Sequence, residues 1–324
     1  MTRRISFSPR WLPAWTLPAL RWAVGVGIVA VLLLRFDVGE VASELRATRL
    51  ELALPAIAGL VAIHLIGAAT WRLLAIRLGD RRLTWAQTLR TYYIAQGLGG
   101  LTPGNIGADA YRVYAAPAGI GAWRSTVRPI VVQRVTSSAA LAGLGLAALT
   151  LLPHSVDVRF VVAASAVLLA IGSSLLAFLL QRPAANGADT RIGQRAPRRA
   201  LGWAIGAGFV LGLAFHAGAI GLSYLLVASI TPIAEPGQVL ACLAIARLSI
   251  LVPISPSGLG LQEGALSFLF LRIGLSPQTA IAAALLNRLA LLATVALGGM
   301  LLATGSRHSA QELPKTESSS LLPS

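Results

Sequence analysis

Hydrophobic residues fall into eight runs along this chain, separated by short polar or basic segments. Six of the runs are long enough for a membrane-spanning helix, which needs about 20 mostly apolar residues. These six runs cover residues 20–36, 50–69, 127–152, 160–180, 201–230 and 279–304. The two shorter runs, residues 84–100 and 238–253, each stop at a motif rich in proline and glycine. The pattern predicts an all-α polytopic membrane protein.

The motif that ends the two short runs occurs twice, about 153 residues apart. The first copy reads LTPGNIGADAYRVY (residues 101–114), and the second reads ISPSGLGLQEGALSF (residues 254–268). Each copy leads into a long apolar run that carries one arginine, Arg134 or Arg288. Two broken membrane segments at corresponding positions of two halves indicate a transport-type binding site at the repeat interface. The alternative is that both motifs are ordinary surface turns between full helices.

The basic residues between the runs indicate which loops face the cytoplasm, because cytoplasmic loops carry an excess of arginine and lysine. Arginines before the first run, after the second run and in the linker of residues 181–200 place all three segments in the cytoplasm. All three basic segments can lie in the cytoplasm only if residues 84–116 and 238–273 are re-entrant hairpins, which do not cross the membrane fully. We expect the first hairpin to enter from the cytoplasm and the second from the external side.

This topology gives each half three full crossings and one hairpin, which inverts the second half relative to the first. The predicted fold is therefore six full transmembrane helices plus two re-entrant Pro-Gly hairpins in an inverted-topology repeat. The repeat halves cover about residues 20–152 and 158–304 of a transmembrane domain at residues 20–304. Residues 1–19 are expected to be a cytoplasmic N-terminus, and residues 305–324 a disordered C-terminal tail.

The composition supports a membrane location. The 324 residues are 56% hydrophobic and 12% charged, whereas a soluble domain is about a quarter charged. The net charge is +15, and the basic residues responsible for it cluster between the hydrophobic runs. This position favours anionic membrane lipids over nucleic acid as the partner. The single cysteine, Cys242, excludes an internal disulfide, and the four histidines have no ligand spacing. We therefore expect no metal and no cofactor.

Two backbone features of the motifs predict an anion site. If helices restart after Pro103 and Pro256, their N-termini present free amides and positive dipole ends to an anion. Glycines in both motifs would let the backbone approach a head group closely. The predicted substrate-binding residues are Gly104, Asn105, Gly107, Asp109, Arg112, Arg134, Ser257, Gly258, Gly260, Glu263 and Arg288.

Interior charges are the second part of this prediction. An arginine deep in a membrane is costly and usually faces a cavity or a partner, which applies to Arg134 and Arg288. Two ion pairs are expected: Asp109 with Arg112 on one helix face, and Arg247 with Glu263 across the second hairpin. The alternative is that these charges neutralise each other and only hold the hairpins together.

The stretches PGNIGADAYRVY and PSGLGLQEGAL, with the arginine in VVQRV, resemble the transmembrane region of the lysylphosphatidylglycerol synthase family, also described as flippase-like. The resemblance covers about residues 20–304. It implies a bacterial inner-membrane protein related to the lipid-translocating part of these enzymes. Some relatives are encoded or fused with glycosyltransferases, so it also implies a glycosyltransferase or lipid-synthesis partner.

The resemblance assigns family motif positions in both copies. They are Pro103, Gly107, Asp109, Arg112 and Arg134 in the first copy, and Pro256, Gly258, Gly260, Glu263 and Gly264 in the second. Relatives often carry an acid where this chain has Gln133, which removes a local ion pair. The chain also has no room after its last helix for a soluble aminoacyl-transferase domain, so we expect no lysine transfer and no enzyme activity.

The leading hypothesis is a flippase for an anionic amphiphile such as a phospholipid, a glycolipid or a polyprenyl-phosphate carrier. One alternative is a membrane-embedded lipid-phosphate transferase, which needs a carboxylate base or an acidic metal cluster. Asp109 and Glu263 are the only candidate buried acids, and they belong to opposite repeats. Another alternative is a non-transporting partner of a glycosyltransferase, with the basic linker as its docking surface.

Overall fold

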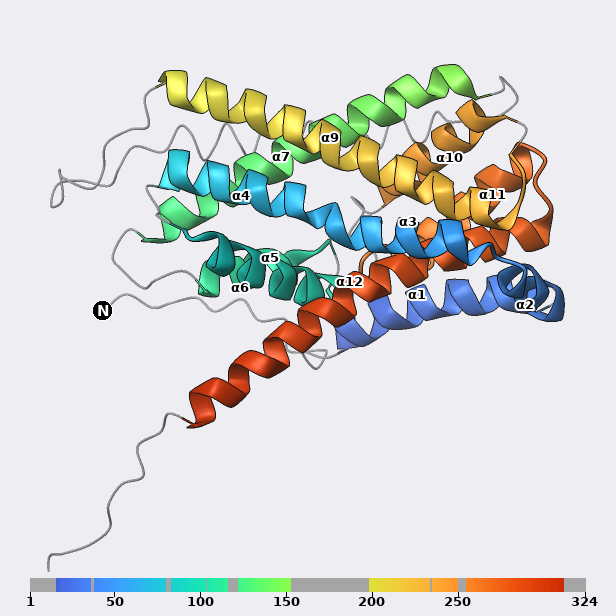
Figure 1. Ribbon diagram of the computed structural model, residues 1–324, viewed down its shortest axis with the longest axis horizontal. Helices are drawn as coiled ribbons and strands as arrows, with labels where there is room; N and C mark the ends of the chain where they lie inside the picture. Colours follow the sequence, from blue (N-terminus) through green and yellow to red (C-terminus); the bar gives the residue numbers. More distant parts are fainter. Residues whose placement is uncertain are drawn as a thin grey trace, which may run out of the picture.

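The computed structural model describes residues 16–35, 38–79, 83–102, 104–115, 122–152, 198–233, 235–249 and 255–311. Every regular element in these ranges is a helix, which confirms the predicted all-α fold (Figure 1). Pro103, the predicted span at residues 160–180 and most of the predicted N-terminal and C-terminal segments lie outside the described residues.

Four helical segments in the described part of the chain are long and apolar enough to cross a membrane. They are Leu50–Leu78, Thr126–Leu151, Ala200–Ile230 and Pro277–Thr304, and each matches a predicted span. The elements that form them are α3 (Leu50–Ala62) with α4 (His64–Gly79), α7 (Ala122–Ala148) with the 3₁₀ turn η1 (Leu149–Leu151), α9 (Arg198–Ile230) and α12 (Pro277–Gln311). The predicted first span corresponds to α1 (Thr16–Arg35), which is followed by the short helix α2 (Val38–Arg46).

Each short hydrophobic run forms the first helix of a pair of short helices, and the repeated motif separates the two helices of each pair. The first pair is α5 (Trp85–Gly100) and α6 (Ile106–Tyr114), and the second is α10 (Pro236–Leu248) and α11 (Leu261–Arg272). We call residues 101–105 the first break and residues 249–260 the second break. Within each pair the two helices pack against each other. Figure 1 shows the two pairs near opposite ends of the long helices.

Each pair of short helices packs against the long arginine-bearing helix of the other half. The helix α5 packs on α12, and α10 packs on α7. The first of these crossings is close because two glycines meet: a Cβ added to Gly97 would lie 3.0 Å from the backbone of Gly298. Small residues permit such close helix approach inside a membrane. The contacts of α5 with α12 and of α10 with α7 therefore join the N-terminal and C-terminal parts of the chain next to the two breaks.

Two boundaries differ from the sequence predictions. The predicted second span ended at residue 69, but α4 continues to Gly79 and carries Arg72 and Arg77 near its end. Their guanidinium groups lie 4.7 Å from the ring centres of Trp85 and Trp203. An arginine can therefore lie within an apolar helix near its end, because its aliphatic stem covers apolar surface while its charged group reaches the edge of that surface. The second difference is that α12 continues to Gln311, past the predicted end at residue 304.

Candidate functional site

The backbone at both breaks adopts the left-handed conformation that permits a sharp reversal. In the first break Gly104 has a φ of 60° and Asn105 a φ of 59°. In the second break Ser257 has a φ of 44°, and Gly258 and Gly260 have φ values of 69° and 79°. Glycine adopts such angles without steric penalty and asparagine tolerates them. These residues therefore lie directly before the helices α6 and α11, which begin at Ile106 and Leu261.

An ionic cluster lies beside the first break. The Asp109 carboxylate on the first turns of α6 pairs with Arg112 of the same helix and, at 2.6 Å, with Arg134 of α7. Arg134 also donates a hydrogen bond of 2.9 Å to the backbone carbonyl of Asn105. Two guanidinium groups therefore share one carboxylate. With both arginines charged, the cluster carries a net positive charge.

Arg112 is the more enclosed of these two arginines, since only 6% of its side chain is exposed. It donates a hydrogen bond of 2.8 Å to Gln133, whose amide nitrogen donates to the carbonyl oxygen of Gly67, also at 2.8 Å. The rings of Trp71 and Tyr92 flank the guanidinium group at 5.8 and 5.7 Å. Its Nε–H is buried and has no hydrogen-bond partner. A buried donor of this kind can bind an anionic oxygen.

The second break carries a closely similar arrangement. Glu263 of α11 pairs with Arg288 of α12, and both side chains are less than 10% exposed. Arg288 also donates a hydrogen bond of 3.3 Å to the backbone carbonyl of Ser257. One Nη atom of Arg288 is buried and has no hydrogen-bond partner. With equal numbers of charges, this second cluster is neutral.

The two clusters follow one plan. In each, the acid and the arginine of the next long helix are 25 residues apart, and the same arginine binds a carbonyl group of the break. The breaks also lie next to each other, because the Ser257 hydroxyl donates to the carbonyl oxygen of Gly99, at 3.5 Å. The structure therefore brings most of the predicted site residues into two neighbouring clusters.

Two expectations about these residues are wrong. Arg247 and Glu263 do not pair; Glu263 binds Arg288 and the Gly260 amide, the latter at 2.7 Å. The amides at the helix N-termini are also not all free, since Gly107 donates to the hydroxyl of Thr102 at 2.8 Å. The backbone amides of Gly107 and Gly260 are therefore capped by side chains of the protein itself. The unpartnered buried donors near the breaks are arginine nitrogens, of Arg112 and Arg288, and the hydroxyl of Ser255.

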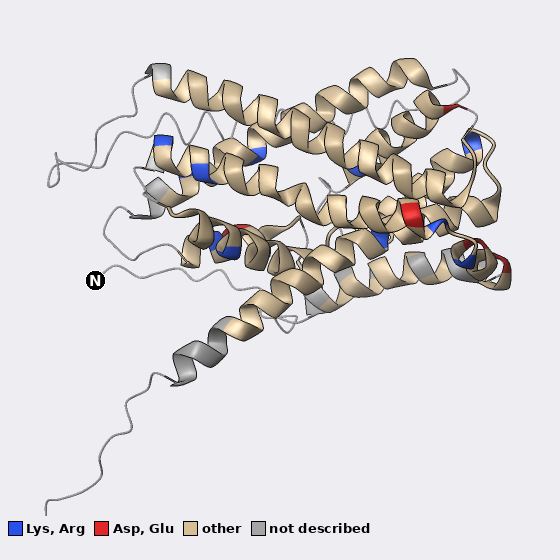
Figure 2. Cartoon of the chain, viewed as in Figure 1, with Lys and Arg blue, Asp and Glu red and all other residues tan. Residues whose placement is uncertain are grey.

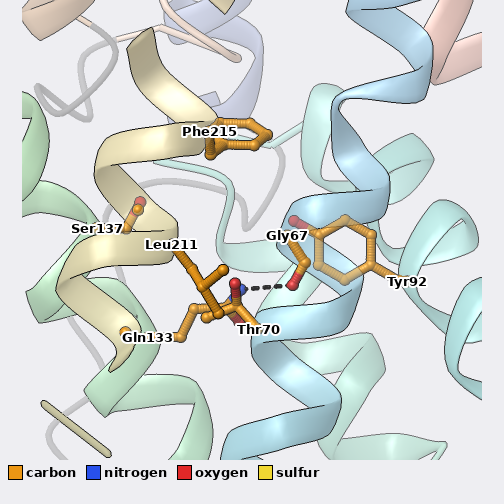
Figure 3. A pocket seen from close by; sticks show the side chains of 9 residues that line it. Gly67, Thr70, Tyr92, Gln133, Ser137, Leu211 and Phe215 are labelled. Atoms are coloured by element: carbon orange, nitrogen blue, oxygen red, sulfur yellow. Dashed lines mark hydrogen bonds between the residues drawn. The ribbon is translucent and has the colours of Figure 1, made fainter. Parts of the chain in front are cut away.

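A cavity of about 40 Å³ lies beside the first cluster, between α4, α5, α7 and α9. Figure 3 shows Tyr92, Gln133, Ser137 and Phe215 around it. Gly67, Gly208 and Gly212 also line it, and the absence of side chains at these positions keeps the helices close while leaving space. The hydrogen bond between Gln133 and Gly67 forms part of its wall.

Sequence reasoning missed several polar partners of the site. Gln96 accepts a hydrogen bond from Asn105 at 3.3 Å, and its amide nitrogen lies 3.4 Å from His64 Nδ1. Gln133 was noted only for the acid it lacks, but it is the direct partner of Arg112. The only available signal was the presence of uncharged polar residues inside hydrophobic runs. Such residues are costly in a membrane and usually face the helix bundle.

A bundle of membrane-length apolar helices, interrupted at two breaks with ion-paired interior charges, defines a polytopic helical membrane protein. Figure 2 shows how sparse the charged residues are along its long helices. Residues 19–299 match the family described as the lysylphosphatidylglycerol synthase TM region, and the chain belongs to this family. This match confirms the resemblance carried by the two motifs. Comparison with curated proteins found no match.

Proposed function

We propose that the protein binds the head group of an anionic lipid at the two breaks and moves it across the bacterial inner membrane. The observation that carries this proposal is the first cluster, where Arg112 and Arg134 share the single carboxylate of Asp109. A phosphate or phosphodiester would supply the missing negative charge and accept the unpartnered Nε–H of Arg112. The acyl or prenyl tails would remain in the surrounding lipid.

The proposed topology has six full crossings and two re-entrant hairpins, with the N-terminus in the cytoplasm. Support comes from the repeated order of a broken helix pair followed by a long arginine-bearing helix. It also comes from the position of the pairs α5–α6 and α10–α11 near opposite ends of the molecule (Figure 1). In inverted-repeat transporters, binding sites form where such discontinuous helices meet. Rocking of one half against the other would then expose the site to each side in turn.

We further propose that the protein carries out no chemical reaction on the lipid. A general base must be free to take up a proton. Asp109 and Glu263 are each ion-paired with an arginine, so neither carboxylate is free to act as a base. The described residues also contain no group of three or more histidine, cysteine or acidic side chains that could hold a metal ion.

Reconstitution into liposomes tests the translocation proposal. Purified protein should accelerate the transbilayer movement of a fluorescent phosphatidylglycerol, followed by quenching of the outer leaflet with dithionite. Arg134→Ala and Arg288→Ala should reduce the rate at least tenfold, because each removes the cation that joins a break to the next long helix. The exposed Arg90 on α5 supplies the matched control, Arg90→Ala, which should retain the wild-type rate.

The lipid assay needs a check that the variants are folded, which a single symmetric peak in size-exclusion chromatography provides. Movement of neutral lipid at the same rate as anionic lipid would contradict the proposed anion site. Unchanged movement in folded Arg134→Ala and Arg288→Ala proteins would contradict the role of both arginines. Binding of anionic lipid without any movement would instead identify a lipid-binding protein that does not transport.

Cysteine labelling tests the proposed topology. In a Cys242→Ala background, a cysteine at position 187 should react with a membrane-impermeant maleimide only after the cytoplasmic face is exposed. Position 187 lies in the basic linker, which the positive-inside rule assigns to the cytoplasm. A cysteine replacing the exposed Glu235, just before α10, should react from the external face in intact cells. Labelling of position 187 from outside would overturn the inverted-hairpin arrangement.

A further inference from the structure

Arg247 stands apart from the two ionic clusters. It lies in the last turn of α10, and its Nε–H is buried and has no hydrogen-bond partner. Its guanidinium group lies over the ring of Phe215 on α9, with the guanidinium carbon 5.9 Å from the ring centre. A neutral ring attracts a cation weakly compared with a carboxylate. Arg247 is therefore an interior cation without a counter-charge in the described part of the protein.

The interior acids that could neutralise Arg247 are already paired. Asp109 binds Arg112 and Arg134, and Glu263 binds Arg288 and the amide of Gly260. The other described acids lie on α2, at the start of α3 and just before α10. An interior charge without a partner is strongly unfavourable, and an arginine within a membrane protein normally pairs or faces a polar cavity.

The surroundings of Arg247 offer further hydrogen-bonding groups. They include two histidines, His64 on α4 and His216 on α9, whose rings both contact Phe215, the ring that Arg247 also contacts. His216 is 9% exposed, its Nε2 lies 3.0 Å from the hydroxyl of Ser137, and its Nδ1 is buried without a partner. When Ser137 donates to Nε2, Nδ1 carries the ring proton and is free to donate.

The cavity described above lies next to this group, because it is lined by Ser137 and Phe215, which both contact His216. Gln133, the partner of Arg112, also lines it. Its volume of about 40 Å³ exceeds the space that one water molecule needs. A species of halide size, or one anionic oxygen of a larger group, therefore fits in the cavity.

We propose that Arg247 and His216 form an interior binding site for a single negative charge, carried by a halide ion or by a lipid phosphodiester. The anion neutralises Arg247 and accepts hydrogen bonds from its Nε–H and from His216 Nδ1. This site differs from the head-group site proposed at the two breaks, because it shares no charged residue with either cluster. It does not depend on lipid transport, since an anion that only stabilises the fold would occupy it equally well.

Thermal unfolding of the purified full-length protein in a neutral detergent tests this site. At constant ionic strength, replacing gluconate by chloride or bromide should raise the Tm by about 5 °C when the halide is at one hundred times its Kd. In a second arm, phosphatidylglycerol replaces phosphatidylcholine in the micelles at low halide. Arg247→Gln should remove the shift for the anion that binds, whereas the exposed-site control Arg90→Gln should keep it. In gluconate, Arg247→Gln should be at least as stable as the wild type.

The two arms identify the source of the charge. A halide shift lost in Arg247→Gln identifies an inorganic anion. A phosphatidylglycerol shift lost in Arg247→Gln but kept in Arg134→Ala identifies a lipid at this site rather than at the first break. The proposal is overturned if no anion raises the wild-type Tm, or if Arg247→Gln keeps the full shift. It is also overturned if Arg247→Gln lowers the Tm equally in every anion, which indicates a packing role only.

If Arg247→Gln does not yield folded protein, His216→Leu replaces it. This variant removes the Nδ1 donor but leaves Arg247 in place, so the anion should still bind and need at least a threefold higher concentration for the same Tm shift. An unchanged concentration dependence in His216→Leu would then exclude the site. Because these measurements follow binding and not transport, they can fail while the translocation proposal stands.

Discussion

Replacing Glu263 by glutamine is expected to lower the free energy of unfolding by about 3–5 kcal/mol. The Glu263 side chain is 4% exposed, and its two carboxylate oxygens accept hydrogen bonds from Arg288 and from the Gly260 amide. Glutamine keeps the size of the side chain but removes its charge. Arg288, itself 9% exposed, would then be a buried cation without a counter-charge. Unfolding of the purified protein by sodium dodecyl sulfate, followed by tryptophan fluorescence, measures the change.

A second substitution separates loss of the pair from loss of packing. In Glu263→Gln with Arg288→Met, neither side chain is charged, so the double variant should recover a large part of the lost stability. Glu235→Gln, at an exposed position before α10, should change the stability by less than about 0.5 kcal/mol. Equal stability of the wild type and Glu263→Gln would show that the buried pair does not hold the second break.

Gly298→Ala is expected to disrupt the contact between the two halves. A Cβ at this position would lie 2.2 Å from the carbonyl oxygen of Tyr93 and 2.8 Å from the Cα of Gly97. These are backbone atoms, so α5 and α12 would have to move apart. We expect a loss of about 3 kcal/mol or more in stability, with a matching loss of lipid movement, because α5 leads into the first break. The same detergent titration and the liposome assay measure both effects.

The neighbouring glycine supplies a control on the same helix. A Cβ at Gly299 meets no atom within 4 Å, so Gly299→Ala should leave the contact between α5 and α12 intact. Alanine favours helix by up to about 1 kcal/mol over glycine, so this variant should be as stable as the wild type or more stable. Similar behaviour of the two alanine variants would contradict the close crossing of α5 and α12.

The regular elements of this fold were predictable because they depend on local sequence. A run of apolar residues longer than a bilayer is thick predicts a spanning helix, and Leu50–Leu78 and Ala200–Ile230 follow that rule. Glycine-rich segments interrupt helices because they populate positive φ, and both motifs form breaks. The ion pair of Asp109 and Arg112 was predictable as well, since residues three apart share a helix face.

Contacts between distant helices could not be read in the same way. The sequence suggested Arg247 as the partner of Glu263, but Arg288 binds it. Which arginine pairs with Glu263 depends on how α10, α11 and α12 are rotated and how closely they cross. Neither the rotation nor the distance between helices can be predicted from composition. The role of Gln133 could not be predicted for the same reason. Its hydrogen bond of 2.8 Å with Arg112 depends on how α6 and α7 pack together.

The membrane class, the family, the two breaks and the charged residues inside the bundle could all be predicted from the amino-acid sequence. Each of these follows from local hydrophobicity, backbone preference or a short motif. Helix packing set which charges neutralise one another, capped the amides of Gly107 and Gly260, and left Arg247 without a counter-charge among the described residues. The physical reason is that electrostatic pairing in a protein interior acts over a few ångströms, a distance fixed by helix packing rather than by position along the chain.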